Sequence, residues 1–592
     1  MCGIFAYLGD RSDAPLLVAK GLKQLEYRGY DSWGIAAAES DDGKTNIFLE
    51  KHTGRVPETA STAFPQSTIA FGHTRWATHG GVTDQNAHPH LDCGGNVAVI
   101  HNGIIENYAE LKKRLVRQGH AFMSETDTET LAHTIEQFKK RISFEQAVRK
   151  TFLTLTGMNA VLALDAESGT VVAVKNGSPL IVGKSVSNEI IFASDVAAIL
   201  PYTKTIHVID DGEMVIAKKH EIALFQAKTG KTLRWKWNTV DWKRDAADIG
   251  SFPYYLIKEI HDQPAMLEQI LLSGGEKVRD IARLIRGKKP ILIGCGTASY
   301  AALVGKYLLA HSGVLAESVA GGEIGYMVPH IKKSDIPIFF SQSGETIDII
   351  EPAMQLKRKK IPFAAFVNVL GSTLYRMTPH RVMLDAGPEI CVLSTKVFVS
   401  KLAHLLLLAG ELGKRGKQTI VDLNSAIHET KHVLEKRYVG KYISPLAKKL
   451  VTKEHMFMLG RGVSYPIALE AALKIKEVTY LHAEGFAGGE LKHGVIALVE
   501  DGTPCFVFAP RDDTQKDIMS CAAEVKARGA FVIGVSQDND PKFDWHIPVK
   551  DCGVASIIPQ IVVIQRLAYE MAVLMGRDPD KPRNLAKSVV VK

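Results

Sequence analysis

Short apolar runs alternate with helical patterns over the C-terminal half of the chain, and this alternation most restricts how the chain can fold. Residues 290–293 and 336–340 are apolar runs typical of buried strands, and each leads into a glycine- and hydroxyl-containing loop before a helical segment. The same strand, loop and helix pattern starts again at 456–462. Parallel strands need crossover connections, which are usually helices, so this alternation is typical of parallel α/β units. We therefore expect two α/β units related by a degenerate internal repeat.

The chain is too long for a single hydrophobic core. Its 592 residues exceed the roughly 100–200 that one domain usually holds, so we expect several domains. The contents of 46% hydrophobic and 23% charged residues are ordinary for a globular protein, and a net charge of +8 is small for this length. No apolar run approaches the ~18 residues of a membrane span, and the short basic clusters lack interleaved aromatic residues. We expect neither a membrane nor a nucleic-acid partner.

The cysteines bear on location and metal binding. There are seven, none in a C-x-x-C pair, and no secretory signal precedes Cys2, which favours a reducing, cytoplasmic compartment. His88, His90, Asp92 and Cys93 lie close enough in sequence to suggest a metal cluster. No second group of ligands has zinc-like spacing, so we expect no metal.

The N-terminus carries the first candidate nucleophile. If Met1 is removed, which the small residue beside it permits, the chain begins with a thiol and a free α-amine on Cys2. An α-amine titrates near pH ~8, so part of it is unprotonated at neutral pH and can take the thiol proton. The alternative is a cysteine that merely precedes a buried strand at residues 4–7. This stretch alone does not decide between them.

Two later stretches offer groups that could bind and polarise a small substrate. Residues 72–80 place Arg75 beside an indole, a hydroxyl and an imidazole, and a planar guanidinium suits fork-like recognition of a carboxylate. Asn102 and Gly103 follow an apolar run and could converge two donors on one oxygen, although in isolation a simple turn explains them better. Asp127 lies in an acidic first turn of a helix and could instead hold an ammonium group.

Taken together, the motifs of the N-terminal half resemble a class II glutamine amidotransferase domain, an N-terminal-nucleophile hydrolase. The resemblance implies that Cys2 attacks the side-chain amide of glutamine, with its own α-amine as the base, and that Asn102 and Gly103 form the oxyanion hole. The motifs that carry it lie at residues 2–4, 27–32, 74–80, 86–90, 101–103 and 125–127. The residues implied to hold the amino-acid end of glutamine are Arg75, Thr78, His79, His88 and Asp127.

The C-terminal half contains a candidate phosphate site and a charged helix. The loop 341–346 reads Ser-Gln-Ser-Gly-Glu-Thr at the start of a helix, without a nearby Lys or Arg, which favours a phosphate monoester over a merely capped helix start. Further on, Glu470, Lys474 and Glu477 share one helix face, ordinarily a solvated ion-pair ladder. This helix runs into glycine-rich loops that would leave His493 beside a cavity.

This half resembles a tandem of sugar isomerase (SIS) domains, and the whole chain resembles the glutamine:fructose-6-phosphate aminotransferase family. The implied fold class is a multidomain α/β protein, in which an αββα sandwich is followed by two three-layer αβα domains. We expect an amidotransferase domain at 1–217, a polar, Trp-rich linker at 218–250, a first sugar isomerase domain at 251–430 and a second at 431–592.

The family resemblance also implies roles at a sugar site. His493 would help to open the sugar ring, Glu477 would move the proton between C1 and C2 with assistance from Lys474, and Lys587 would place an amine near the sugar carbonyl. Trp76 would gate an internal ammonia channel. The residues implied to bind the sugar phosphate are Thr297, Ser341, Gln342, Ser343 and Thr346.

The implied reaction is the glutamine-dependent amination and isomerisation of fructose 6-phosphate to glucosamine 6-phosphate and glutamate, the first step of UDP-GlcNAc synthesis. It needs no cofactor, and α/β domains of this kind usually pair about a two-fold axis, so we expect a homodimer. Two departures from the family pattern, Ala298 and the loop at Cys391, leave the identity of the ketose phosphate open.

Two other functions fit part of the chain. One is a plain sugar-phosphate isomerase or deglycase, and the other is a regulatory sensor of sugar phosphates. Against the sensor stand Cys2, Glu477, His493 and Lys587, because a sensor would need none of them.

Overall fold

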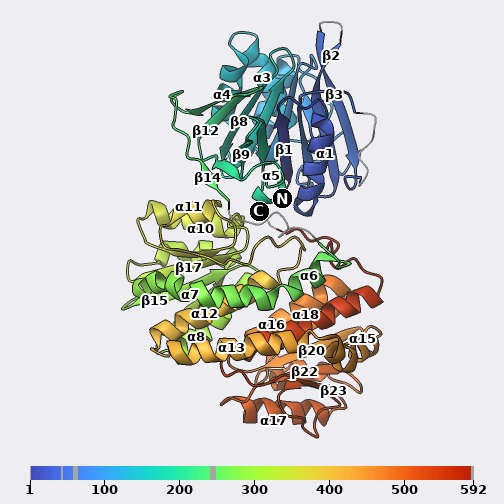
Figure 1. Cartoon of the computed structure of the whole chain (residues 1–592), viewed down its shortest axis with the longest axis vertical. Coiled ribbons are helices and arrows are strands. Elements are labelled where there is room, and N and C mark those ends of the chain that lie inside the picture. Colours follow the sequence, from blue (N-terminus) through green and yellow to red (C-terminus); the bar gives the residue numbers. More distant parts are fainter. Residues whose placement is uncertain (1, 42–43, 58–63, 241–248, 588–592) are drawn as a thin grey trace. The chain divides into compact units, whose positions relative to one another are not determined.

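The computed structural model describes residues 2–41, 44–57, 64–240 and 249–587 (Figure 1). The chain divides into two compact units. Unit 1 comprises Met1–Ala247 with Ala586–Lys592, and unit 2 comprises Asp248–Leu585. Each unit has its own sheets and its own core, as expected for a chain of this length.

Unit 1 contains two antiparallel sheets. The strands of the first are β1 (Gly3–Leu8), β2 (Ser32–Asp41), β3 (Lys44–Thr53), β4 (Ile69–Arg75), β9 (Ile181–Lys184), β10 (Ile190–Ala193), β11 (Thr205–Val208) and β14 (Asn238–Thr239). They lie in the order β14-β11-β9-β10-β1-β4-β2-β3. The strands of the second are β5 (His90–Leu91), β6 (Val97–Gly103), β7 (Asn159–Asp165), β8 (Thr170–Asn176), β12 (Glu213–Lys218) and β13 (Glu221–Gln226), in the order β13-β12-β8-β7-β6-β5.

Helices cover the outer face of each sheet in unit 1. The first sheet packs against α1 (Ala14–Leu25) and α5 (Val196–Ile199), and the second against α2 (Tyr108–Arg117), α3 (Glu129–Lys139) and α4 (Phe144–Thr154). Strand β1 is buried on both faces, since Phe5 packs in the core with α1 while Ile4 packs in the core between the two sheets. This arrangement confirms the predicted αββα sandwich.

The second sheet continues past residue 217, where the sequence predicted the domain to end. Strand β13 pairs with β12 along its whole length, because a tight turn after Lys218 reverses the chain onto the sheet. The first part of the expected linker therefore belongs to the sandwich, and Trp235 packs against the core between the two sheets. Residues 241–248 of that linker lie outside the described residues.

Unit 2 contains two parallel sheets with equivalent strand orders. The first holds β15 (Lys289–Gly294), β16 (Glu317–Ala320), β17 (Asp335–Ser341), β18 (Ala364–Val367) and β19 (Arg381–Met383), in the order β16-β15-β17-β18-β19. The second holds β20 (His455–Gly460), β21 (His482–Ala487), β22 (Pro504–Ala509), β23 (Phe531–Ser536) and β24 (Trp545–Pro548), in the order β21-β20-β22-β23-β24. The same order in both sheets confirms the predicted internal repeat.

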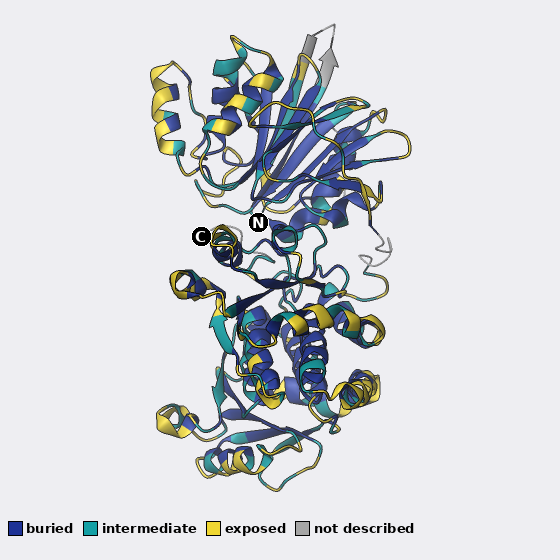
Figure 2. Cartoon of the chain, turned by 90° about the vertical axis from the view of Figure 1, so that its left-hand side faces the viewer, coloured by how far each residue is buried: buried dark blue, intermediate teal, exposed yellow. Residues whose placement is uncertain are grey.

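The helices of unit 2 pack on both sheets, and many contribute to a core cluster that draws residues from each sheet (Figure 2). Among them, α16 packs against both α8 and α18. The helices are α6 (Tyr255–His261), α7 (Gln263–Ile285), α8 (Thr297–His311), α9 (Gly321–Met327), α10 (Ile347–Arg358), α11 (Thr373–Met377), α12 (Lys396–Leu412), α13 (Gly416–Val433), α14 (Lys436–Tyr438), α15 (Ser444–Leu450), α16 (Ser464–Thr479), α17 (Gln515–Lys526) and α18 (Ile557–Leu574).

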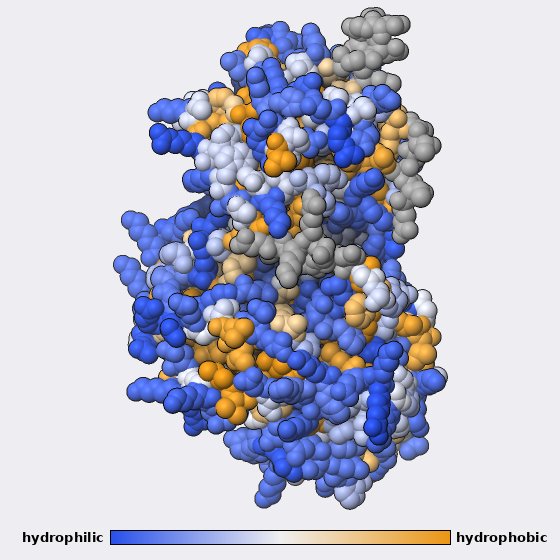
Figure 3. Space-filling view, in the orientation of Figure 1, coloured by the Kyte–Doolittle hydropathy of each residue, from blue (hydrophilic) through white to orange (hydrophobic). Residues whose placement is uncertain are grey.

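One helical segment of the described residues, Gly553–Leu574, is long and apolar enough to cross a membrane by length and composition alone. Of its most apolar stretch, 78% is buried inside unit 2, as in the core helix of a globular domain. The face in Figure 3 is mainly hydrophilic, with hydrophobic residues in scattered groups.

Candidate active sites

Cys2 lies directly before β1 and is held by three other parts of unit 1. The backbone N–H of Trp76 donates a hydrogen bond to Cys2 Sγ at 3.2 Å. The backbone oxygen of Cys2 accepts hydrogen bonds from Arg28 Nε at 3.3 Å and from Asn102 Nδ2 at 3.2 Å. The structure thus brings the predicted nucleophile, Trp76 and Asn102 together from segments far apart in the sequence.

The thiol of Cys2 does not ionise readily in this setting. Burial raises the pKa of Cys2, although nearby positive charges, including Arg75 and Arg28, act in the opposite direction. The thiolate is the nucleophilic form of cysteine, so a thiol with a raised pKa needs a base to become reactive.

The backbone conformation at Asn102 and Gly103 differs from a simple turn. Both residues belong to β6 and pair with β7. The φ angle of Gly103 is 134°, and a Cβ atom there would lie 2.0 Å from the backbone oxygen of Met158. Only glycine fits this position, and the side chain of Asn102 is directed at Cys2.

The guanidinium of Arg75 is anchored to the loop that follows it. It donates to the backbone oxygens of His79, Gly80 and Gly81, the last at 3.0 Å from Nη1. These bonds use both terminal nitrogens but not Nε. A guanidinium has five donors, so Arg75 retains capacity for a further acceptor.

The other residues predicted to bind glutamine have distinct surroundings. His88 is buried and its ring stacks on His73 with centroids 4.2 Å apart, and burial lowers the pKa of His88 well below its usual range. Asp127 accepts a hydrogen bond at Oδ2 from the backbone N–H of Ile105 at 2.8 Å. Thr78 is exposed. Their roles toward glutamine stay predictions.

The rings of His79 and Trp76 each pack against a tyrosine. The His79 ring contacts Tyr108 edge-on at 5.1 Å, and the Trp76 ring contacts Tyr30 edge-on at 5.5 Å. The backbone of Trp76 is therefore hydrogen-bonded to Cys2, and its indole ring packs against Tyr30. Its role as a gate stays a prediction.

The charged face of α16 is buried, not solvated as such a ladder ordinarily is. Lys474 Nζ lies 2.5 Å from Glu477 Oε2 and 3.3 Å from Glu470 Oε1. The exposed side-chain fractions of Lys474 and Glu470 are only 1% and 0%. Lys474 also donates to Thr297 Oγ1 at 3.1 Å, because α16 packs against α8, which begins at that threonine.

Burial and mutual charge set the ionisation of this cluster. Burial raises the pKa of Glu470 to about 7, despite the favourable charge of Lys474. Burial opposes the charged form of Lys474, but the two carboxylates outweigh that effect and the pKa of Lys474 is raised above its usual value. Lys474 is therefore a permanent cation in the working pH range, and Glu470 titrates near neutrality.

The predicted phosphate loop lies between β17 and α10. Within it, Ser341 Oγ accepts from the N–H of Gly344 at 2.9 Å, and Ser343 Oγ accepts from the N–H of Glu345 at 3.1 Å. Thr346 is the N-cap residue of α10 but makes no side-chain cap hydrogen bond. The hydroxyls of the two serines thus hold the loop in its conformation. Helix capping does not account for the presence of a threonine at position 346, because its hydroxyl caps nothing.

The loop before α8 and the phosphate loop share one edge of the sheet. Strands β15 and β17 are parallel neighbours, so the loops after them, at 294–297 and 341–346, leave the sheet at the same edge. Ligands of open α/β sheets bind at this carboxyl edge. Thr297, however, contacts Glu470 and Lys474, so the structure joins the first repeat to the charged helix of the second.

Two predicted sugar-site residues lie apart from these contacts. His493 is exposed at the end of a short 3-10 helix (Leu491–His493), and its imidazole makes no hydrogen bond or ion pair with the described residues. Its place beside a cavity and its role in ring opening stay predictions. Lys587 groups with unit 1, so its role at the sugar carbonyl stays a prediction.

The two departures from the family pattern are both buried. Ala298 packs in the core of unit 2. Cys391 is 0% exposed, and its Sγ donates to the backbone oxygen of Pro579 at 3.4 Å. The bulk that Cys391 adds thus lies against the C-terminal segment of the chain.

Comparisons with known proteins agree with this architecture. Residues 37–227 match the glutamine amidotransferase domain family, and residues 283–410 and 449–542 match the SIS domain family. The chain is 39% identical to proteins named glutamine--fructose-6-phosphate aminotransferase (isomerizing) from Pyrococcus horikoshii and from Thermus thermophilus, with 100% of each chain covered. The chain belongs to the glutamine--fructose-6-phosphate aminotransferase (isomerizing) family.

A solved structure from this aminotransferase family covers unit 2. The C-terminal domain of glucosamine-fructose-6-phosphate aminotransferase from Francisella tularensis is 28% identical, with a TM-score of 0.50 over 56% of this chain and 99% of that one. The two ranges that match the SIS domain family include the phosphate loop and α16. Cys2 lies before the range that matches the glutamine amidotransferase domain family.

Arg28 contacts the backbone oxygen of Cys2 and His73 contacts the side chain of Asn102, and the sequence assigned neither of them a role at the site. Arg28 and His73 lie inside stretches that the sequence singled out, and Arg28 also pairs with Asp195 at 2.9 Å. The residues that Arg28 and His73 contact are distant in sequence. The only available signal was that both residues lie inside stretches, 27–32 and 72–80, that contain other candidate site residues.

Proposed function

We propose that this chain converts glutamine and fructose 6-phosphate into glutamate and glucosamine 6-phosphate. The observation that carries the proposal is Cys2 at the start of β1, with Trp76 and Asn102 bonded to it. Full-length similarity to proteins named for this activity supports it.

The glutaminase step would follow from the geometry around Cys2. After removal of Met1, the α-amine of Cys2 would take the thiol proton, and Sγ would attack the side-chain carbonyl of glutamine. Asn102 and Gly103 would stabilise the oxyanion of the tetrahedral intermediate. Ammonia would leave, and water would then cleave the thioester to release glutamate. Arg75, Thr78, His79, His88 and Asp127 would hold the amino-acid end of glutamine.

The sugar step would use the buried cluster of α16. Ammonia would attack C2 of the open-chain ketose, and loss of water would give an imine. Glu477 would then take a proton from C1 as the imine nitrogen gains one, which gives an enolamine, and would return a proton to C2 as the C1 hydroxyl loses one, so that the ketose imine becomes the aldose amine. Lys474 Nζ, 2.5 Å from Glu477 Oε2, would hold that carboxyl group in position for these transfers.

The sugar would be held by its phosphate. Thr297, Ser341, Gln342, Ser343 and Thr346 would bind that group, supported by their place at the carboxyl edge of a parallel sheet. His493 would assist ring opening, and Lys587 would place its amine near the carbonyl.

The same proposal covers the route of ammonia and the setting of the enzyme. Ammonia would pass from Cys2 to the sugar through a channel gated by Trp76, because ammonia stays neutral only away from water. We further propose a cytoplasmic homodimer without nucleic-acid or membrane partners. The proposed steps use groups of the chain itself.

The deciding experiment incubates the purified protein with glutamine and fructose 6-phosphate and follows glutamate and amino sugar phosphate together. Glutamate and amino sugar phosphate are expected to form in equal amounts. Cys2→Ala should abolish the glutamine-dependent reaction but keep synthesis from added ammonia. Amino sugar formation from glutamine by Cys2→Ala would overturn the assignment of the nucleophile, and glucose 6-phosphate as the sole product would instead indicate a plain isomerase.

A further inference from the structure

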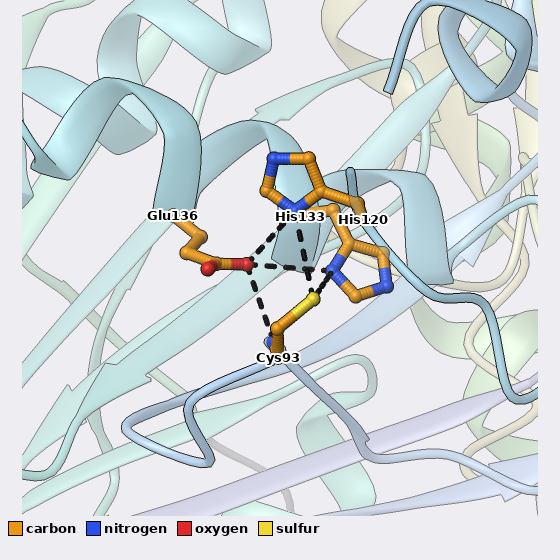
Figure 4. A group of neighbouring side chains, drawn as sticks. All are labelled: Cys93, His120, His133 and Glu136. Carbon is orange, nitrogen blue, oxygen red and sulfur yellow. Dashed lines mark hydrogen bonds and ion pairs between the residues drawn. The ribbon is translucent and has the colours of Figure 1, made fainter. Parts of the chain in front are cut away.

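Four side chains that can bind metal ions converge in unit 1 from three separate segments (Figure 4). Cys93 lies in the turn between β5 and β6, His120 lies between α2 and α3, and His133 and Glu136 lie on α3. Their ligand atoms all lie within 4.8 Å of one another. These residues take no part in the proposed reaction.

Four of the six distances within the group are close to those around a tetrahedral ion. Cys93 Sγ lies 3.6 Å from His120 Nδ1 and 3.5 Å from His133 Nδ1. Glu136 Oε2 lies 3.0 Å from the first of these nitrogens and 3.5 Å from the second. With zinc–sulfur bonds of about 2.3 Å and zinc–nitrogen or zinc–oxygen bonds of about 2.0 Å, tetrahedral geometry places sulfur and nitrogen about 3.5 Å apart, and nitrogen and oxygen about 3.3 Å apart.

An outer partner directs the lone pair of the His120 imidazole into the group. His120 Nε2 lies 3.3 Å from Gln137 Oε1, which can only accept, so the proton of that ring belongs on Nε2. His133 Nε2 lies 3.4 Å from Glu129 Oε1, without a hydrogen bond between them. Such outer acceptors are a regular feature of histidine metal ligands.

Without a cation this arrangement is unfavourable. Glu136 Oε2 accepts from the backbone N–H of Cys93 at 3.2 Å, but the Nδ1 lone pair of His120 and the sulfur have only the thiol hydrogen of Cys93 to share. His120 and His133 are buried, so water cannot freely solvate their Nδ1 atoms. A single bound cation would satisfy all four ligand atoms at once.

We propose that Cys93, His120, His133 and Glu136 bind one zinc ion. One thiolate, two imidazoles and one carboxylate form a mixed ligand set of the kind that zinc accepts. Four protein ligands fill a tetrahedral shell, so the ion has a structural role, and the exposed side of Cys93 opens a path from solvent. This proposal replaces the expectation, drawn from sequence spacing, that the chain holds no metal.

The site connects two elements that carry the proposed glutamine site. Helix α3 begins two residues after Asp127, and β6, which follows the turn of Cys93, ends at Asn102 and Gly103. Zinc would fix α3 against this turn. The ion thereby stabilises the frame of the site without contacting glutamine.

The test measures zinc in the full-length protein after dialysis against metal-free buffer and addition of one equivalent of zinc. One tightly bound zinc per chain is expected, and cobalt in its place should give thiolate charge-transfer and tetrahedral absorption bands. Cys93→Ser and His133→Gln should lose the ion, while His428→Gln, an exposed histidine on α13, should retain it. Gln137→Ala should raise the Kd about 10- to 100-fold.

A second measurement needs no variant and so does not depend on a substituted protein folding. Zinc should protect Cys93 of the wild-type protein from iodoacetamide, as read by peptide mass spectrometry, and a chelator should restore labelling. Equal labelling of Cys93 with and without zinc, or unchanged zinc content in Cys93→Ser, would overturn the proposal.

Discussion

His73 Nε2 lies 3.0 Å from Asn102 Oδ1, and Nδ2 of the same amide lies 3.2 Å from the backbone oxygen of Cys2. Burial lowers the pKa of His73 to about 3, so the ring is neutral in the working pH range. A neutral ring with its proton on Nε2 donates to Oδ1 and leaves Nδ2 of Asn102 to face the nucleophile. His73 is thus a positioning residue for the proposed oxyanion donor.

His73→Leu should lower kcat for glutamine hydrolysis about 10- to 100-fold, because the Asn102 amide is no longer held in one orientation. The KM for glutamine should change little. His73→Gln should keep most of the rate, since its side-chain N–H can donate to the same oxygen. Steady-state kinetics of glutamate release tests this, and equal loss in both variants would indicate a packing role alone.

Gly103→Ala should destabilise unit 1 by about 1–3 kcal/mol from backbone strain, with a further cost from the contact with Met158. Glutamine hydrolysis should be lost, while synthesis from added ammonia persists. Gly81→Ala is the matched control, because its Cβ would lie 4.0 Å from the nearest atom. Full glutaminase activity in Gly103→Ala would contradict the assigned role of this backbone.

Lys474→Met should destabilise unit 2 by about 3–5 kcal/mol, because two carboxylates are then left near one another without their buried cation. The double variant with Glu470→Gln should recover part of that loss. Lys476→Met, exposed on the same helix, is the control and should be nearly neutral. Calorimetric unfolding of the variants checks this, and a neutral Lys474→Met would show that the cluster is solvated.

Glu470 should make the stability of unit 2 depend on pH. Its pKa is about 7 in the folded state, above the ~4.3 of an unfolded glutamate, so the folded state binds the proton more tightly. The free energy of unfolding therefore falls by on the order of 3–4 kcal/mol in total as pH rises through this window, and levels off above about pH 7.

Glu470→Gln should remove this pH dependence. As pH rises from about 5 to 8, the free energy of unfolding of the variant should increase relative to that of the wild type. This holds even if loss of the ion pair makes the variant less stable at every pH. Glu500→Gln, exposed in a turn, should follow the wild-type curve. Parallel curves for wild type and Glu470→Gln would mean that Glu470 is already ionised throughout.

The sequence was sufficient for the fold class and for the repeat of unit 2. The apolar runs at β1, β6, β15 and β17 have a strong local pattern, and strands of this kind are specified by neighbouring residues. The predicted end of the sandwich was wrong by two strands, because β13 and β14 join the sheets through their pairing with β12 and β11.

The burial of the charged face of α16 could not be predicted from the sequence, because it depends on tertiary structure. The same holds for the convergence of Cys93, His120, His133 and Glu136. Sequence spacing places Glu470, Lys474 and Glu477 on one face, but whether that face meets water depends on α8, whose Thr297 contacts Glu470 and Lys474.

The sequence by itself determined the fold class and the stretches that carry the glutamine and sugar chemistry, because these are local patterns of residues. Only the tertiary structure decided that His73 orients Asn102, that Lys474 is buried, and that Cys93 meets His120 and His133. Each of these contacts joins segments brought together by packing, and no spacing along the chain encodes the distance between their atoms.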